Sequence, residues 1–371
     1  MNDRSTQKLR LKSLDILRGF DMFWIIGGGA LILALEKMNS MAWIQPIAAQ
    51  MHHVKWEGFH FFDLIFPLFM FISGVAIPFA ITSKVEKGVD KKSLQWKIVR
   101  RALILVVFGI MYNGALQKGF AEARYASVLG QIGLAYGIAA SIVLHTKSVK
   151  IHVVWLLLIL IFITVLQLFV PVPGYGAGLL EPGRSINAWI DQLLLPGKLY
   201  GRTYDPEGIL CIVSAVSVTL MGAIAGVLVR SGKLSLTKKA LTLFISGVVL
   251  IIVSLLLSPV YPIIKKIWTV PFNLHAGGIS LILLALFYYV FDVQNMCGKI
   301  CSKISFFFMI IGLNSITIYM AARIIPFRDI SLFFTGWLAA PAGEWIVVVG
   351  MITLEWLLLY YLYRKNIFLR V

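Results

Sequence analysis

The sequence predicts an all-α fold, a polytopic transmembrane helix bundle of about ten spans, and three observations lead to that prediction. Hydrophobic residues make up 59% of the 371 residues and charged residues only 14%, whereas charged residues are about a quarter of a soluble domain. Apolar stretches of roughly 20 residues, long enough to cross a bilayer core, recur along the whole chain. Lys and Arg gather in short clusters between these stretches, as they do at the ends of membrane spans.

The first predicted span follows a basic N-terminal segment. Its apolar run is longer than the core of a signal peptide and shows no small-residue cleavage site, so we expect it to be retained. Each later span is an apolar run bounded by charged residues or by Pro and Gly. In chain order, the predicted spans cover residues 14–36, 58–83, 97–117, 127–146, 151–170, 208–229, 240–258, 273–292, 304–324 and 343–363.

The distribution of basic residues predicts the orientation of the spans. When both termini are placed in the cytoplasm, Lys and Arg are about twice as frequent in the cytoplasmic segments as in the outer ones, which is the positive-inside pattern. Topology therefore accounts for the net charge of +17, and we expect the lipid bilayer, and no nucleic acid, as a partner. The chain is predicted to be one transmembrane domain, residues 1–371, with outer loops at about 37–57 and 171–207.

Ionisable residues inside a span are costly in lipid, so each one is a candidate functional residue. In the first span, Asp15, Arg18 and Asp21 follow one another at steps of three and share one side of the helix. Two interpretations stay open: an ion pair that locks helix packing, or a role of Arg18 in binding phosphate or substrate. The glycines at positions 27–29 allow a close backbone approach or a local break in the helix.

The segment HHVKWEGFHFFDLIFP, residues 52–67, holds the densest group of polar residues, at the outer end of the second span. If it is helical, one face is shared by His53, Glu57, His60 and Asp63. A histidine acts as base or nucleophile near neutral pH, and a carboxylate fixes its tautomer and stabilises its charged form. The segment therefore indicates acyl-transfer machinery, with a metal site and ordinary interfacial histidines as competing interpretations.

Two further features bear on binding. The segment IGLNSITIYMAAR of the ninth span places Asn314 among hydroxyl groups in a low-dielectric interior, where they need hydrogen-bond partners and are candidates to line a cavity. The cysteine pair of CGKIC lacks the two further ligands of a structural zinc site, so we expect no metal.

Five motifs occur in one order along the chain: RLKSLDILRGFDMF, HHVKWEGFHFFDLIFPLFMFISG, YDPEGIL, KKIWTVPF and GLNSITIY. In this order and spacing the chain resembles the bacterial relatives of heparan-alpha-glucosaminide N-acetyltransferase. The resemblance implies transfer of an acetyl group from cytosolic acetyl-CoA to the amine of a terminal glucosamine or similar amino sugar. It further implies a multi-pass protein of the bacterial inner (cytoplasmic) membrane that acts on the periplasmic side, and a homodimer by analogy.

The resemblance also implies roles for single residues. The histidine of the family's HxxWxG motif falls on His53, and the aspartate of its DLxFP motif falls on Asp63, so these two are the predicted catalytic pair. His53 would either deprotonate the amine or carry the acetyl group itself. The residues expected to bind the amino sugar are Trp56, Glu57, Asp205 and Glu207.

Basic residues near the cytoplasmic side are the expected partners of acetyl-CoA. Lys97, Arg100 and Arg101 are placed to meet its phosphates, although residues that only set topology would occupy the same positions. Arg18 and Asn314 complete the predicted acetyl-CoA site.

Two other functions stay open. An O-acetyltransferase of a cell-envelope polysaccharide would use His53 as a base equally well. A secondary transporter would line its path with buried charges such as Asp15, Asp63 and Glu355, but the sequence shows no inverted repeat.

Overall fold

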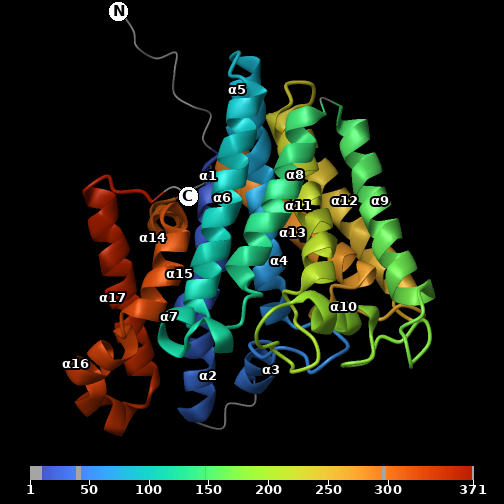
Figure 1. Cartoon of the computed structure of the whole chain (residues 1–371). Coiled ribbons are helices and arrows are strands. Elements are labelled where there is room, and N and C mark those ends of the chain that lie inside the picture. Colours follow the sequence, from blue (N-terminus) through green and yellow to red (C-terminus); the bar gives the residue numbers. More distant parts are fainter. Residues whose placement is uncertain (1–10, 39–42, 147, 295–297, 370–371) are drawn as a thin grey trace, which may run out of the picture. The chain divides into compact units, whose positions relative to one another are not determined.

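The computed structural model of the chain (Figure 1) describes four stretches: residues 11–38, 43–146, 148–294 and 298–369. All regular secondary structure in these stretches is helical, apart from two isolated β-bridges. The all-α prediction is confirmed.

Eight helices in the described stretches are long and apolar enough to cross a membrane. They are Lys12–Met38, Phe61–Glu86, Val128–His145, Val149–Phe169, Ile209–Arg230, Leu236–Leu257, Val270–Val293 and Trp345–Arg364. A ninth span results if Cys301–Leu313 and Ser315–Ile324, which meet at a bend of 71°, are counted together. The described residues thus hold eight or nine candidate spans where the sequence predicts about ten. The orientation with both termini in the cytoplasm stays a prediction.

The predicted span at residues 97–117 is not among these helices. It corresponds to α6 (Lys91–Tyr112), a helix of 22 residues. Its first half carries Lys97, Arg100 and Arg101, so charge and not length distinguishes it from the other candidate spans. α6 packs along α8 (Val128–His145).

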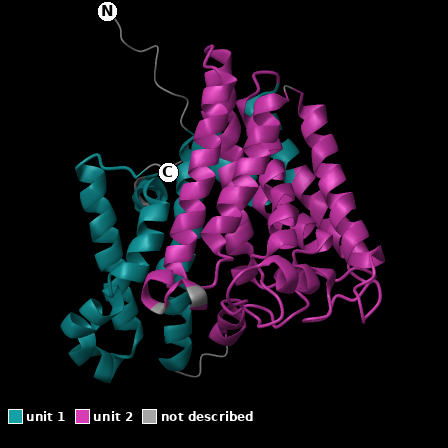
Figure 2. Ribbon diagram, viewed as in Figure 1, with its two compact units in different colours: residues 1–40, 234–244, 282–369 teal, residues 41–233, 245–281, 370–371 magenta. Residues whose placement is uncertain are grey.

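The chain divides into two compact units (Figure 2). Unit 1 comprises residues 1–40, 234–244 and 282–369, and unit 2 comprises residues 41–233, 245–281 and 370–371. Helices α12 (Leu236–Leu257) and α13 (Val270–Tyr288) contribute residues to both units. This division into units does not test the prediction of a single transmembrane domain, which stays a prediction.

Unit 1 is organised around the close contact of α1 (Lys12–Phe23) with α14 (Lys299–Leu313). Besides parts of α12 and α13, its other elements are η1 (Trp24–Gly28), α2 (Gly29–Met38), η5 (Tyr289–Val293), α15 (Ser315–Ile324), α16 (Phe327–Ala342) and α17 (Trp345–Arg364). A Cβ added at Gly19 would lie 1.7 Å from the carbonyl oxygen of Phe308, so only glycine permits this approach. At the glycine run the helix changes to a π-helical turn, η1, but continues to Met38, so the chain is not broken there.

Unit 2 is organised around α4 and α11. Its elements, besides α6 and α8, are α3 (Ile44–Ala49), α4 (Phe61–Ile77), η2 (Pro78–Thr82), α5 (Ser83–Glu86), α7 (Ala115–Lys118), η3 (Phe120–Glu122), α9 (Val149–Phe169), α10 (Ile186–Leu194), α11 (Ile209–Arg230) and η4 (Lys265–Ile267). A Cβ at Gly222 would lie 2.0 Å from the Phe71 carbonyl oxygen, and one at Gly226 would lie 2.4 Å from that of Val75. The two helices therefore run in the same direction, and their N-termini share the end of unit 2 where the connecting loops gather (Figure 1).

Candidate active site

His53 and Asp63, the predicted catalytic pair, are in contact within unit 2. His53 Nδ1 lies 2.7 Å from Asp63 Oδ1. The Asp63 side chain is 2% exposed and the His53 side chain 51%. A buried carboxylate on Nδ1 holds the imidazole in the Nδ1–H tautomer and leaves the lone pair of Nε2 for a substrate. The pair therefore has the geometry of a base, or nucleophile, and its orienting carboxylate.

The residue spacing predicted that the two side chains meet along one face of a helix. The structure shows no helix at this place. Residues 51–60 contain no helix, and α4 begins at Phe61. Gly58 has φ 111°, which side-chain-bearing residues rarely adopt, and His60 is fully extended. The expected helical face was wrong because these two residues turn the chain, and the turn itself brings His53 back to α4.

Asp63 accepts hydrogen bonds on both of its oxygens. Oδ2 accepts from the backbone nitrogens of Val54 at 3.3 Å and His60 at 3.1 Å. Oδ1 faces His53 Nδ1 at 2.7 Å and Lys265 Nζ at 3.2 Å. A carboxylate offers about four acceptor sites, and all of them meet a donor here. Its place in the first turn of α4 further stabilises the negative charge.

Lys265 was not among the candidates from the sequence, although it belongs to the KKIWTVPF motif. Its Nζ lies 3.2 Å from His53 Nδ1 as well as from Asp63, and its side chain is 17% exposed. Burial lowers the pKa of Lys265, while the negative charges of Asp63 and Glu207 act in the opposite direction. The motif was the only sequence signal for this residue.

Buried amides hold the backbone from which Lys265 reaches the site. The side-chain amides of Gln167 and Asn187 donate to the Ile267 carbonyl oxygen at 2.8 and 3.2 Å. Trp268 follows in the left-handed region, with φ 48°, and is completely buried. Such a conformation costs a non-glycine residue about 1–3 kcal/mol, so the surrounding packing has to enforce it.

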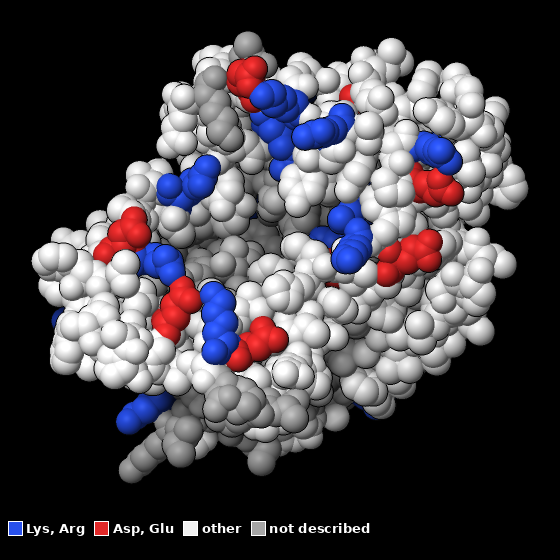
Figure 3. Space-filling view, turned by 90° about the horizontal axis from the view of Figure 1, so that it is seen from below, with Lys and Arg blue, Asp and Glu red and all other residues white. Residues whose placement is uncertain are grey.

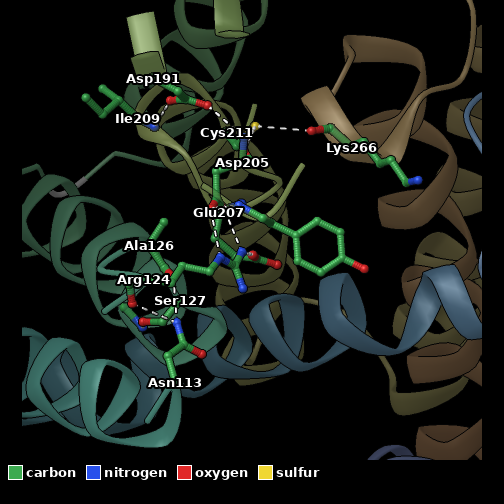
Figure 4. A network of polar contacts seen from close by, with 12 residues as sticks. Asn113, Arg124, Ala126, Ser127, Asp191, Asp205, Glu207, Ile209, Cys211 and Lys266 are labelled. Atoms are coloured by element: carbon green, nitrogen blue, oxygen red, sulfur yellow. Dashed lines mark hydrogen bonds and ion pairs between the residues drawn. The ribbon is translucent and has the colours of Figure 1, made fainter. Parts of the chain in front are cut away.

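Asp205 and Glu207, expected to bind substrate, face Arg124 instead (Figure 4). Arg124 Nε and Nη2 donate to the two Asp205 oxygens at 2.7 and 2.5 Å, and Nη2 also pairs with Glu207. The Tyr200 ring lies 5.0 Å from the guanidinium carbon. Arg124 lies in no sequence motif, so only the structure reveals that both carboxylates are held by it.

The side chain of Asp191, on α10, caps the N-terminus of α11 (Figure 4). Its Oδ1 accepts from the backbone nitrogen of Ile209 at 3.0 Å, and its Oδ2 from that of Asp205 at 3.2 Å. The first N–H groups of a helix lack partners within it, so this side chain supplies one. Burial raises the pKa of Asp191 to about 7 and that of Glu207 to about 7. Burial thus shifts both carboxyl groups toward their protonated form.

Trp56 and Glu57 follow His53 in the same loop. Trp56 Nε1 donates to the Leu180 carbonyl oxygen at 2.9 Å, and its ring meets Tyr204 edge to face at 5.2 Å. Lys266 Nζ lies 5.9 Å from the same ring. Trp56 is half-buried and joins the loop to its neighbours, whereas Glu57 is exposed.

Comparison with known proteins relates the chain to acetyltransferases. A family model described as "Domain of unknown function (DUF5009)" matches residues 10–170. Heparan-alpha-glucosaminide N-acetyltransferase of Mus musculus is 26% identical over 378 residues, covering 86% of the chain and 56% of that protein. The Homo sapiens protein of the same name is 26% identical over 425 residues, covering 98% of the chain and 60% of that protein. The chain is a distant relative of these acetyltransferases.

The resemblance predicted from the five motifs is thereby confirmed. The chain spans 56% and 60% of the length of the two relatives. Because the match to the human protein covers 98% of the chain, it extends over both units.

Three of the residues predicted to bind acetyl-CoA lie on α6 of unit 2. Lys97 and Arg100 are exposed. Arg101 is half-buried, and its guanidinium carbon lies 4.2 Å from the centre of the Tyr136 ring. The first two side chains are therefore the more open to an anionic ligand.

The other two predicted acetyl-CoA partners lie in unit 1. Arg18 Nη1 is 3.5 Å from Asp15 Oδ1, as their spacing predicts. Asn314 is 2% exposed, and its amide donates to the Ile367 carbonyl oxygen at 3.0 Å and accepts from the Leu369 nitrogen at 3.1 Å. Asn314 therefore holds the C-terminal segment at the bend between α14 and α15.

The face of the molecule in Figure 3 carries basic and acidic side chains beside one another rather than a patch of one sign. Exposed ion pairs of the described residues include Lys198 with Glu122, Arg184 with Glu181, and Lys37 with Glu344. Selection of a charged substrate therefore depends on individual groups more than on a broad field.

Proposed function

We propose that the chain is a membrane acetyltransferase that moves the acetyl group of cytosolic acetyl-CoA to the amine of a terminal glucosamine, or a similar amino sugar, on the periplasmic side of a bacterial inner membrane. One observation carries the proposal: the half-exposed ring of His53, whose Nδ1 lies 2.7 Å from buried Asp63. The distant relation to proteins named heparan-alpha-glucosaminide N-acetyltransferase supports the type of reaction. The eight or nine apolar helices support a membrane setting.

The reaction in one step balances as follows. The amino sugar, an ammonium ion in neutral water, first releases one proton to solvent. The free amine attacks the thioester carbonyl carbon, so a C–N bond forms and the C–S bond breaks. His53 Nε2 takes the second amine proton and returns it to the sulfur of the departing CoA. One proton is released overall, and no oxidant or reductant is needed.

A two-step route uses the same nitrogen. His53 Nε2 attacks the thioester and CoA leaves as a thiolate. The amine then attacks the carbonyl of the acetyl-imidazole, which releases the ring, and the proton that the amine loses protonates the thiolate. In both routes Asp63 holds Nδ1 and stabilises the positive charge that forms on the imidazole. Rapid quenching with labelled acetyl-CoA and no acceptor separates the routes, because only the second leaves acetyl on the protein.

For the acceptor, we assign Glu57 to the ammonium group, since this carboxylate is exposed and lies four residues after His53. Trp56 offers the remaining open part of its ring to a sugar face. We assign Asp205 and Glu207 to the structure of the loop, because both already pair with Arg124.

For the donor, we assign Lys97 and Arg100 to the CoA phosphates, because both charges are exposed on one helix of unit 2. Arg101, which stacks on a tyrosine, supports their helix. Arg18 and Asn314 already have partners in unit 1, and for them a contact with acetyl-CoA is the weaker assignment.

Two alternatives have support. A hydroxyl of a cell-envelope polysaccharide would be deprotonated by His53 in the same way. A secondary transporter is favoured by the 71° bend at Asn314, because transporters place binding sites at interrupted helices.

The proposal is tested with purified protein, acetyl-CoA labelled in the acetyl group, and glucosamine. Wild type is expected to form labelled N-acetylglucosamine, and His53→Ala to lose about 10²- to 10⁴-fold of the rate while still binding acetyl-CoA. Binding of acetyl-CoA without transfer to glucosamine would move the proposal to the hydroxyl acceptor. No binding of acetyl-CoA would refute it and favour the transporter.

A further inference from the structure

We infer that Lys265 is a positioning residue for the reacting histidine: it completes the donors around Asp63 and so keeps the proton of His53 on Nδ1. The inference rests on the proposed function of His53 and deepens it. Lys265 comes from the loop between α12 and α13, whereas His53 precedes α4, so the sequence separates the two widely.

The four hydrogen-bond donors around Asp63 carry the inference. Oδ2 is occupied by the backbone nitrogens of Val54 and His60. Oδ1 is occupied by His53 Nδ1 and by Lys265 Nζ. Together these donors stabilise the carboxylate in its charged form, so it does not take the Nδ1 proton from the ring. The proton that Nε2 takes from the amine therefore leaves toward the CoA sulfur, while the Nδ1 proton stays in place.

Lys265 Nζ lies 3.2 Å from both His53 Nδ1 and Asp63 Oδ1, so the contact that assigns the Nδ1 proton is the shorter one between the ring and the carboxylate. His53 Nδ1 is 2.7 Å from Asp63 Oδ1 but 3.2 Å from Lys265 Nζ. Two donors that share one acceptor oxygen necessarily lie close to each other. Nδ1 therefore keeps its proton, and the lysine contributes through Asp63.

The positive charge of Lys265 is also balanced by negative charges around it. Asp63 lies on one side of its ammonium group, and the negative charge of Glu207 also acts on it. The adjacent Lys266 differs, because its Nζ donates to the Lys55 carbonyl oxygen at 2.6 Å. Lys266 is thus a matched control: an equal charge in the same loop without a contact to Asp63.

The first test reads the tautomer of His53 directly, without substrate. Nitrogen NMR of histidine-labelled protein, with the His53 signal assigned from His53→Gln, is expected to show the Nδ1–H form in wild type. In Lys265→Met the carboxylate lacks its cation, so the pair takes up one proton from solvent more readily: Nε2 is protonated, the Nδ1 proton passes to Asp63, and the Nε2–H form is expected to appear. Lys265→Arg and Lys266→Met are expected to keep the wild-type tautomer.

The second test is steady-state acetyl transfer. Lys265→Met is expected to lower kcat about 10- to 100-fold, as a misplaced catalytic group does, with the KM for acetyl-CoA unchanged. Lys265→Arg is expected to recover most of this loss. A wild-type tautomer and kcat in Lys265→Met would overturn the inference, and so would equal losses in Lys265→Met and Lys266→Met.

The two tests separate the inference from the proposed function. If wild type transfers no acetyl group but Lys265→Met changes the tautomer, the reaction is wrongly assigned and the positioning role is right. If Lys265→Met does not fold, Lys265→Gln is measured instead, since its shorter uncharged side chain is expected to give the same change. A wild-type tautomer in Lys265→Gln would then overturn the inference.

Discussion

Replacing Asp63 with asparagine is expected to remove most of the catalytic rate while leaving α4 in place. All four partners of the carboxylate are donors, whereas an amide has an acceptor oxygen on one side only. The NH₂ group then faces either His53 or the backbone N–H groups at the start of α4. The imidazole can adapt by moving its proton to Nε2, and Lys265 Nζ, 3.2 Å from Nδ1, can then donate to that nitrogen. The backbone cannot adapt, so the NH₂ group is expected to face His53.

The size of the expected loss of rate follows from the change of tautomer. With its proton on Nε2, His53 has no lone pair there and cannot act as base or nucleophile. The corresponding change of tautomer in a serine protease triad costs about 10⁴-fold in kcat, or about 5 kcal/mol in the activation free energy at about 1.36 kcal/mol per tenfold. The alternative orientation would leave two backbone donors unpaired, at about 1–3 kcal/mol of stability each.

The assay is single-turnover acetyl transfer, with thermal unfolding and acetyl-CoA binding measured on the same preparation. We expect a rate about 10³- to 10⁴-fold below wild type for Asp63→Asn, with a small change in thermal midpoint and no change in acetyl-CoA affinity. Asp329→Asn, at an exposed position of α16, is the control. A wild-type rate in a folded Asp63→Asn protein would refute the orienting role of the carboxylate.

Two further predictions concern stability. Arg124→Met leaves Asp205 and Glu207 buried without their cation, so the free energy of unfolding, measured by thermal unfolding, should fall by about 3 kcal/mol. The control Arg184→Met breaks an exposed ion pair and should change the free energy of unfolding by less than about 1 kcal/mol. Because burial raises the pKa of Asp191 to about 7 from about 3.9 in an unfolded chain, its contribution to stability is present in full below about pH 4 and is lost as the pH rises through 7. Thermal midpoints measured from pH 5 to 8 should therefore fall less steeply in Asp191→Asn than in wild type.

Each of these predictions has a result that contradicts it. Equal losses of stability in Arg124→Met and Arg184→Met would show that burial of the cluster does not matter. An Asp191→Asn midpoint that falls with pH as steeply as that of wild type would assign the slope to Glu207 alone, whose pKa burial also raises to about 7.

The sequence predicts the helical membrane class well because apolar length and basic clusters are local features. At α6 the same basic residues that indicate the cytoplasmic side distinguish the helix, by their charge, from the other candidate spans. The pairing of His53 with Asp63 was expected from a helical spacing, yet the contact is made by an extended turn with Gly58 at positive φ. A motif can thus point to the right partners through the wrong local geometry.

Partners distant in sequence could not be predicted in this way. Asp205 and Glu207 look like free acidic groups of an outer loop until Arg124, from another loop, is placed beside them. Lys265 reaches Asp63 only because buried amides and a left-handed Trp268 fix its backbone. Such contacts depend on the tertiary fold, which single-residue patterns do not encode.

The most direct measurement of the central claim is the chemical form of acetyl transferred to glucosamine. Mild alkali removes an acetyl ester and leaves an acetamide intact, so alkali-stable label reports transfer to the amine. We predict alkali-stable label from acetyl-CoA with wild type and its loss with His53→Ala. Label of equal amount with both proteins, or no label on glucosamine at all, would contradict the assignment of His53 as the residue that transfers acetyl to an amino sugar.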